Sequence, residues 1–143
     1  MTNATMTKFG YPRTLLMQGR HWALLARPAQ VTLGSLVLCS RSEANAYGAL
    51  PADAFVEQGK MVAAAEDLLR RFVSFDRINY LMLMMVDPNV HFHIIPRYST
   101  PRQFDGMDFP DSAWPGPPDL TRTTPLHDSV LAALKRLTDS SVA

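Results

Sequence analysis

The sequence predicts a single α+β domain with an antiparallel sheet, a long helix packed on one face of the sheet, and a C-terminal helix. Three features indicate this class. Short apolar runs bounded by turn residues are typical of strands, and one segment keeps helical periodicity over several turns. A short turn joins two apolar runs and favours a hairpin over a crossover. The length of 143 residues suits one domain.

The chain divides into three zones. Residues 1–13 are small and polar, and we expect a flexible N-terminus. The core is expected in residues 14–98, where strand-like and helix-like runs alternate. Residues 99–143 hold a proline-rich loop and a closing helix, which we expect to pack on the same domain.

The elements follow in order along the chain. Residues 21–26 and 35–39 predict two strands, with Gly34 in the turn before the second strand. Residues 51–72 predict the long helix, because apolar side chains recur at helical spacing and Pro51 suits a first turn. Near the end, Thr124 can cap the last helix, with Pro125 in its first turn and Asp128 near the positive end of the helix dipole.

Residues 79–86 are apolar almost throughout, which predicts a central strand buried on both faces. Asp87-Pro88-Asn89 is strong turn chemistry. Residues 90–95 are therefore predicted to return antiparallel to the preceding strand.

Composition and charge narrow the function classes. With 14 Lys and Arg against 13 Asp and Glu, the net charge is +1. This balance argues against a dedicated nucleic-acid or membrane-surface protein. The sequence contains a single cysteine, Cys39, so no internal disulfide can form. Since no apolar run has the length of a signal or a membrane span, we expect a cytoplasmic protein with no membrane partner.

The most informative segment is residues 89–98, Asn-Val-His-Phe-His-Ile-Ile-Pro-Arg-Tyr. Side chains alternate across a strand, so Val90, Phe92 and Ile94 form one face, which the long helix can cover. Asn89 and the two histidines then share the other face. The rise of a strand places His91 and His93 about 7 Å apart along it.

Three interpretations of this pair stay open at this point. The histidines can lie on a solvated sheet face without any function. They can bind a metal, although the candidate third ligands, Asp87, His21 and His127, stand at no recognisable spacing, so we predict no metal. In the third interpretation, one imidazole attacks phosphorus and the other helps to stabilise the charge on the phosphoryl oxygens.

Residues 89–98 resemble the signature of the histidine triad superfamily, His-φ-His-φ-His-φ-φ-Pro-Arg, in which φ is an apolar residue. Phe92, Ile94 and Ile95 fill three apolar positions, and Pro96-Arg97 completes the motif. The order of elements over residues 14–98 is similar as well. The resemblance implies an antiparallel α+β fold, a homodimer, and cleavage or transfer of nucleoside monophosphates without a cofactor.

The resemblance also implies roles for single residues. His91 occupies the place of the nucleophile that forms a nucleotidyl-histidine intermediate, and His93 that of the histidine that contacts the phosphate. Family substrates are diadenosine polyphosphates, nucleoside phosphoramidates and nucleotide sugars. Asn89 replaces the first histidine, and we expect it to help orient the site.

The departures from the family pattern favour a second hypothesis, a nucleotide-binding protein with little or no turnover. The family segment that helps protonate the leaving group has no counterpart, and Asp87 stands in a shorter loop. Arg27 stands near the position where an asparagine often contacts the ribose. The candidate substrate-binding residues are Arg97, Arg27, Asp87, Arg102 and Trp114.

Overall fold

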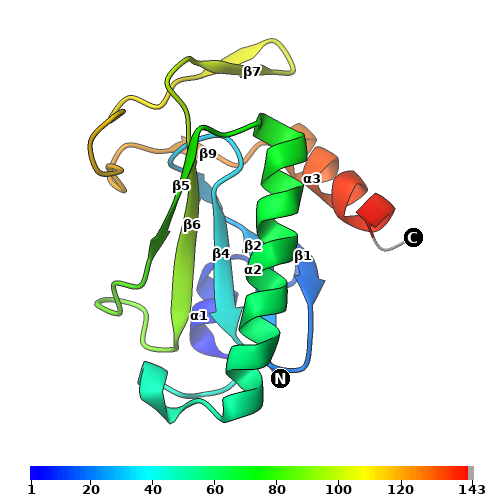
Figure 1. Ribbon diagram of the computed structural model, residues 1–143, viewed down its shortest axis with the longest axis vertical. Helices are drawn as coiled ribbons and strands as arrows, with labels where there is room; N and C mark the ends of the chain where they lie inside the picture. Colours follow the sequence, from blue (N-terminus) through cyan, green and yellow to red (C-terminus); the bar gives the residue numbers. More distant parts are fainter. Residues whose placement is uncertain (142–143) are drawn as a thin grey trace.

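In the computed structural model, which describes residues 1–141, five strands form one antiparallel sheet in the order β1-β2-β4-β6-β5 (Figure 1). The predicted α+β class is confirmed, because one long helix covers a face of this sheet and a second helix lies near the C-terminus. The five strands are Leu15–Gln18 (β1), Trp22–Ala26 (β2), Leu36–Ser40 (β4), Arg77–Leu81 (β5) and His91–Arg97 (β6).

Helix α2, Ala52–Val73, is the long helix that the periodicity predicted. It begins after Pro51 and ends at Ser74, whose φ of 50° is left-handed and whose N–H donates to the Arg70 carbonyl. Its apolar stripe packs on the sheet, and this interface forms the main core together with α3. The buried side chains of the stripe are Ala54, Met61, Ala65, Leu68, Leu69 and Val73.

The strand predicted over residues 79–86 is shorter than expected and lies elsewhere in the sheet. β5 pairs with β6 as predicted, but it forms the edge of the sheet and is only partly buried. The remaining apolar residues lie in the loop that follows, where Met85 is 86% exposed and Val86 is 80% exposed. The prediction of a central strand was wrong because the apolar run serves two purposes, a strand and a loop.

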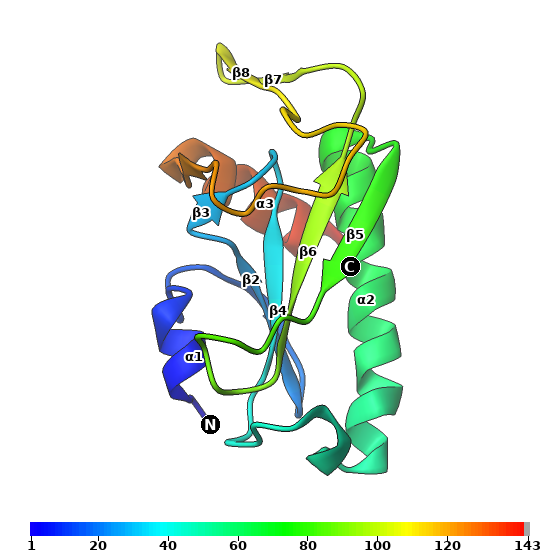
Figure 2. The ribbon, with the colours of Figure 1, turned by 90° about the vertical axis from the view of Figure 1, so that its left-hand side faces the viewer.

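The C-terminal segment also departs from the prediction at one point. Thr124–Pro125 does not begin a helix but forms a short strand, β9, paired with Ala29–Gln30 (β3). Helix α3 begins after this pair and spans Asp128–Ser141. The proline-rich region holds a hairpin of Arg102–Phe104 (β7) and Met107–Phe109 (β8), which extends from one end of the sheet (Figures 1 and 2).

None of the helices within residues 1–141 has the length and apolarity needed to cross a bilayer.

The N-terminal residues, expected to be flexible, contain helix α1, Ala4–Lys8, which packs on the sheet face opposite α2 (Figure 2). Asn3 caps this helix by accepting from the Met6 N–H at 2.9 Å. The same side chain donates to the Ser40 carbonyl oxygen, and Met6 is fully buried. A short polar segment thus gains order from tertiary contacts that its composition does not indicate.

Candidate functional site

The two faces of β6 divide as the alternation predicts. Phe92 and Ile94 join the core beneath α2, together with their neighbours on β4. His91 and His93 lie on the opposite face, where their cross-strand partners are Cys39 and Val37. The two rings stand close together, with centroids 5.1 Å apart and planes at 86°. β6 therefore separates an apolar face from a face that carries two imidazoles.

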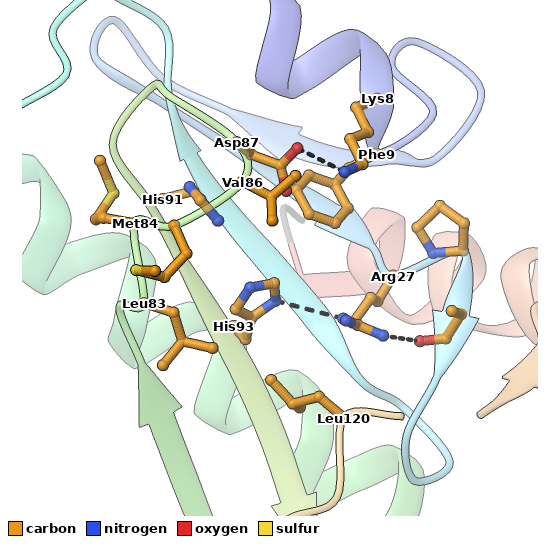
Figure 3. Close-up of a pocket in the computed structure, with 13 residues that line it drawn as sticks. Lys8, Phe9, Arg27, Leu83, Met84, Val86, Asp87, His91, His93 and Leu120 are labelled. Carbon is orange, nitrogen blue, oxygen red and sulfur yellow. Dashed lines mark hydrogen bonds and ion pairs between the residues drawn. The ribbon is translucent and has the colours of Figure 1, made fainter. Parts of the chain in front are cut away.

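The imidazoles line a cavity of about 380 Å³ between the sheet and the loop that joins β5 to β6 (Figure 3). This volume lies within the roughly 300–1,000 Å³ range of small-molecule sites. As residues, His91 and His93 are only 2% and 5% exposed. The remaining wall comes from the end of α1, the segment after β2, the β5–β6 loop and one leucine of the proline-rich region: Lys8, Phe9, Arg27, Pro28, Ala29, residues 83–87 and Leu120.

A hydrogen bond to the backbone sets the tautomer of the neutral His91 ring. Its Nδ1 atom lies 2.8 Å from the Asn89 carbonyl oxygen, which can only accept, so Nδ1 carries the hydrogen. The lone pair of the neutral ring is then on Nε2. Among residues 1–141, this Nε2 atom has no hydrogen-bond partner, and packing does not seal it from solvent.

The His93 ring has the opposite arrangement. Arg27 Nε donates to His93 Nδ1 at 3.3 Å, so the hydrogen of the neutral ring is on Nε2. Burial, with the nearby Arg27 charge and His91, lowers the pKa of His93 to about 4. The ring is therefore neutral near pH 7 and presents an N–H donor that is unpaired within the described residues.

Phe9 holds the two rings from the side of α1. Its ring centroid lies 5.6 Å from that of His91 and 5.7 Å from that of His93. Phe9 is only 8% exposed. Figure 3 shows the three rings together beneath the loop that carries Val86. This aromatic contact restricts the orientation of both imidazoles.

Two of the candidate substrate-binding residues, Arg27 and Asp87, line the cavity. Besides its bond to His93, Arg27 donates from Nη1 to the Ala29 carbonyl oxygen, while its Nη2 has no partner in residues 1–141. Burial lowers the pKa of the Arg27 guanidinium, and the Asp87 carboxylate acts against this shift. Asp87 forms an ion pair with Lys8 at 2.8 Å across the cavity rim.

The side chain of Asn89 does not line the cavity, which corrects its expected position beside the two rings. Its Oδ1 accepts from the N–H and the hydroxyl of Thr5, at 3.3 and 3.1 Å. Asn89 lies on the α1 side of the sheet, as the alternation predicts, since Val90 joins the core beneath α2. Its side chain is bound by Thr5 and so does not reach the cavity. Only the backbone carbonyl of Asn89 takes part in the site.

Three further candidates lie outside the cavity. Arg97 is 3% exposed and forms a bidentate ion pair with Asp111, with Nε–Oδ2 at 2.7 Å and Nη2–Oδ1 at 3.0 Å. Arg102 lies over the Tyr98 ring, and its Nε donates to the Val73 carbonyl oxygen. Trp114 borders a separate hollow beside Arg97. None of these three side chains lines the histidine cavity.

Sequence reasoning missed much of the cavity wall. Lys8 and Phe9 belong to the segment expected to be loose, and residues 83–86 to the predicted central strand. One signal was available, because Asn3 followed by Met6 and Phe9 has the spacing of a capped helical turn with one apolar side. Leu120 carries no such local signal.

The described residues contain no group of three or more His, Cys, Asp or Glu side chains that could hold a metal ion. Two of the candidate third ligands have other partners. Asp87 pairs with Lys8, and His21 pairs with Asp53 at 3.1 Å.

The protein has the fold of the histidine triad proteins, with the histidine strand β6 between β4 and the edge strand β5 and its imidazoles facing away from the long helix. It is similar to a histidine triad protein of Sinorhizobium meliloti, with a TM-score of 0.75, 13% identity, and coverage of 98% of this chain and 95% of that one. A histidine triad protein of Bradyrhizobium japonicum gives a TM-score of 0.71 at 19% identity, with 96% and 97% of the two chains covered.

A third similar structure is a hypothetical histidine triad nucleotide-binding protein of Sulfolobus tokodaii, with a TM-score of 0.66, 18% identity, and coverage of 90% and 83%. No family model and no curated protein matches the sequence. At these identities, the similarity establishes the fold.

Proposed function

We propose that this protein is a histidine triad nucleotide hydrolase or nucleotidyltransferase that acts through a nucleotidyl-histidine intermediate. The observation that carries the proposal is the hydrogen bond from His91 Nδ1 to the Asn89 carbonyl oxygen at 2.8 Å. It directs the lone pair to Nε2, on a ring that lines the cavity. The nucleotide-binding description of the similar Sulfolobus tokodaii protein supports the same class of ligand.

In the first step, the His91 Nε2 lone pair forms a bond to the α-phosphorus of a nucleoside phosphoramidate or phosphoanhydride. The bond from phosphorus to the leaving nitrogen or oxygen breaks, and its electron pair stays with the leaving group, which takes up a proton from solvent. The Nδ1–H bond to the Asn89 carbonyl then stabilises the positive charge on the substituted ring. Water attacks the phosphorus in the second step and releases the nucleoside monophosphate and free His91.

His93 and Arg27 supply the contacts to the phosphoryl oxygens. His93 is neutral and presents Nε2–H, while the unpaired Nη2 of Arg27 adds a charged donor. Such fixed donors favour the transition state because they need no rearrangement when charge develops on the oxygens. Asp87 lies at the rim, where its ion pair with Lys8 balances one positive charge.

Steady-state assays with adenosine 5′-phosphoramidate and diadenosine tetraphosphate test the proposal. We expect the wild type to release AMP from at least one of them and the His91→Ala variant to release none above background. Calorimetry with AMP tests the alternative, a nucleotide-binding protein with little turnover. Tight binding of AMP without cleavage of either substrate would favour that alternative and contradict the enzyme.

We also propose that the protein acts as a homodimer in the cytoplasm. β5 lies at the sheet edge, and exposed apolar side chains lie on and near the α2 side of the sheet: Tyr47, Phe55, Val56 and Tyr80. A second copy that pairs along this edge would cover them. Light scattering should give a mass of two chains, and a mass of one chain would contradict the dimer.

A further inference from the structure

Asn89 stands at the position of the first histidine in the signature, but its side chain binds helix α1. Its Oδ1 accepts two hydrogen bonds from Thr5, and its backbone N–H donates to the Thr5 hydroxyl at 3.0 Å. Its Nδ2 donates to the Glu43 carbonyl oxygen at 3.1 Å. Asn89 and Thr5 are only 4% and 1% exposed, so these bonds are protected from competing water.

The same residue also orients the proposed nucleophile, because its carbonyl oxygen accepts from His91 Nδ1. α1 ends at the cavity. The Phe9 N–H donates to the Thr5 carbonyl oxygen at 3.1 Å, and the Phe9 ring contacts both imidazoles. Lys8 continues the wall through its ion pair with Asp87. Asn89 therefore connects α1 and the His91 ring through one backbone unit.

A histidine cannot make the same set of bonds. A carboxamide oxygen has two lone pairs and accepts from both Thr5 groups while the amide nitrogen donates to Glu43. A neutral imidazole has a single acceptor nitrogen and a single donor nitrogen. One Thr5 group would lose its partner, and the larger ring would have to enter a position that packing has already closed.

We propose that Asn89 is a positioning residue that fixes α1 and Phe9 against the His91 ring, and that asparagine at this position contributes to turnover. The proposal rests on the proposed function. Under this proposal, asparagine in place of the first histidine supports activity at this site. Replacing Asn89 by histidine should therefore slow the reaction.

The kinetic test compares Asn89→His, Asn89→Ala and Thr5→Val with the wild type in the phosphoramidate assay. Because a displacement of the ring of 1 Å can cost up to 10²-fold, we expect kcat to fall about tenfold or more in each variant. KM should change less than about threefold, since the phosphate donors stay in place. Thr5→Ser keeps the hydroxyl and should retain wild-type kcat, and His127→Ala, outside the cavity, is the matched histidine control.

The Asn89→Ala/Thr5→Val double variant should lose less activity than the product of the two single losses, because both changes remove the bond from the Thr5 hydroxyl to Asn89 Oδ1. Equal or faster turnover by Asn89→His, or additive losses in the double variant, would overturn the proposal. Thr5→Val keeps the shape of the side chain and serves as the test if the Asn89 variants do not fold.

A second measurement does not depend on catalysis. Amide hydrogen exchange of residues 6–9 should be at least about tenfold faster in Thr5→Val than in Thr5→Ser, and the ¹⁵N shifts of the His91 ring should move toward a mixture of tautomers. Unchanged exchange and ring shifts would overturn the positioning role. An inactive wild type that shows these changes would contradict the proposed function but keep the connection between Asn89 and α1.

Discussion

The two ends of β6 carry polar groups on the same face, yet they differ in what those groups still offer. At one end, Arg97 is 3% exposed, with Nε and Nη2 on Asp111 and Nη1 on Asn79 at 2.8 Å. At the other end, His91 and His93 are about as buried, but each ring has one nitrogen fixed and one unpaired at the cavity.

This comparison shows that burial and polarity do not by themselves identify a site. The guanidinium of Arg97 has a partner for each of its three nitrogens, so these bonds stabilise the folded protein. The imidazoles keep a lone pair and an N–H donor, which is what a phosphoryl group requires. Substitutions at the two ends should therefore affect different properties, activity at one end and stability at the other.

The largest expected effect follows from removing His91, the proposed nucleophile. His91→Ala should lower kcat/KM by at least about 10³-fold, because Arg27 engages the lone pair of His93, the other imidazole at the cavity. AMP binding by calorimetry should change far less, since His93 and Arg27 stay in place. His127→Ala should be indistinguishable from wild type in the same assay. Turnover by His91→Ala within tenfold of wild type would contradict the role of His91 as nucleophile.

Arg97→Met should act at the other end of the strand and on stability. It leaves the Asp111 carboxylate, which is 3% exposed, without its partner. Breaking a buried ion pair in this way costs about 3–5 kcal/mol of unfolding free energy, measured by urea denaturation. The Arg97→Met/Asp111→Leu double variant should recover most of the loss, and kcat of the folded Arg97→Met protein should match wild type. A loss of activity without a loss of stability would reverse our assignment.

Arg27→Met provides the contrast with Arg97. Removing the charged donor should weaken transition-state binding by about 1.5–3 kcal/mol, seen as a lower kcat/KM. The free energy of unfolding should change less than in Arg97→Met, because Nη2 of Arg27 has no partner within residues 1–141. If Arg27→Met were the more destabilised of the two variants, the comparison of the arginines would fail.

The smallest effect concerns the pH dependence of stability. The pKa of His93 is about 4 in the folded protein, below the ordinary value of 6.5. Between these pH values, the unfolded chain binds more protons at this residue, so stability is full above pH 6.5 and falls as the pH drops toward 4. In His93→Gln, this part of the loss should disappear from urea unfolding at pH 7 and pH 4.5, and equal pH dependence in the two proteins would contradict the low pKa.

The sequence predicted the elements whose signals are local. The alternation of β6 and the stripe of α2 are repeated over several residues, so they indicate which faces are apolar. Met82 to Val86 shows where this fails, because an apolar run predicts burial whether it lies in a core or at the rim of a cavity. α1 has too few turns for its periodicity to stand out, and its order comes from Asn89 and Ser40, which are distant in sequence.

The same limit applies to the candidate site. The motif predicted that His91 and His93 share a face, because this follows from strand geometry alone. It could not indicate that Arg97 pairs with Asp111, since the carboxylate lies in the proline-rich region and its position depends on the folded loop. Nor could it indicate that Asn89 turns toward Thr5. Such contacts depend on tertiary structure that no local pattern encodes.

The most direct test of the central claim is to map the covalent adduct in a rapidly quenched reaction of the wild type with a nucleoside phosphoramidate. We expect mass spectrometry to find one nucleoside monophosphate on the peptide that contains residues 89–98, with fragmentation placing it on His91. Rapid product release with no adduct at any time point, or an adduct placed on His93, would contradict the claim that His91 Nε2 attacks the phosphorus.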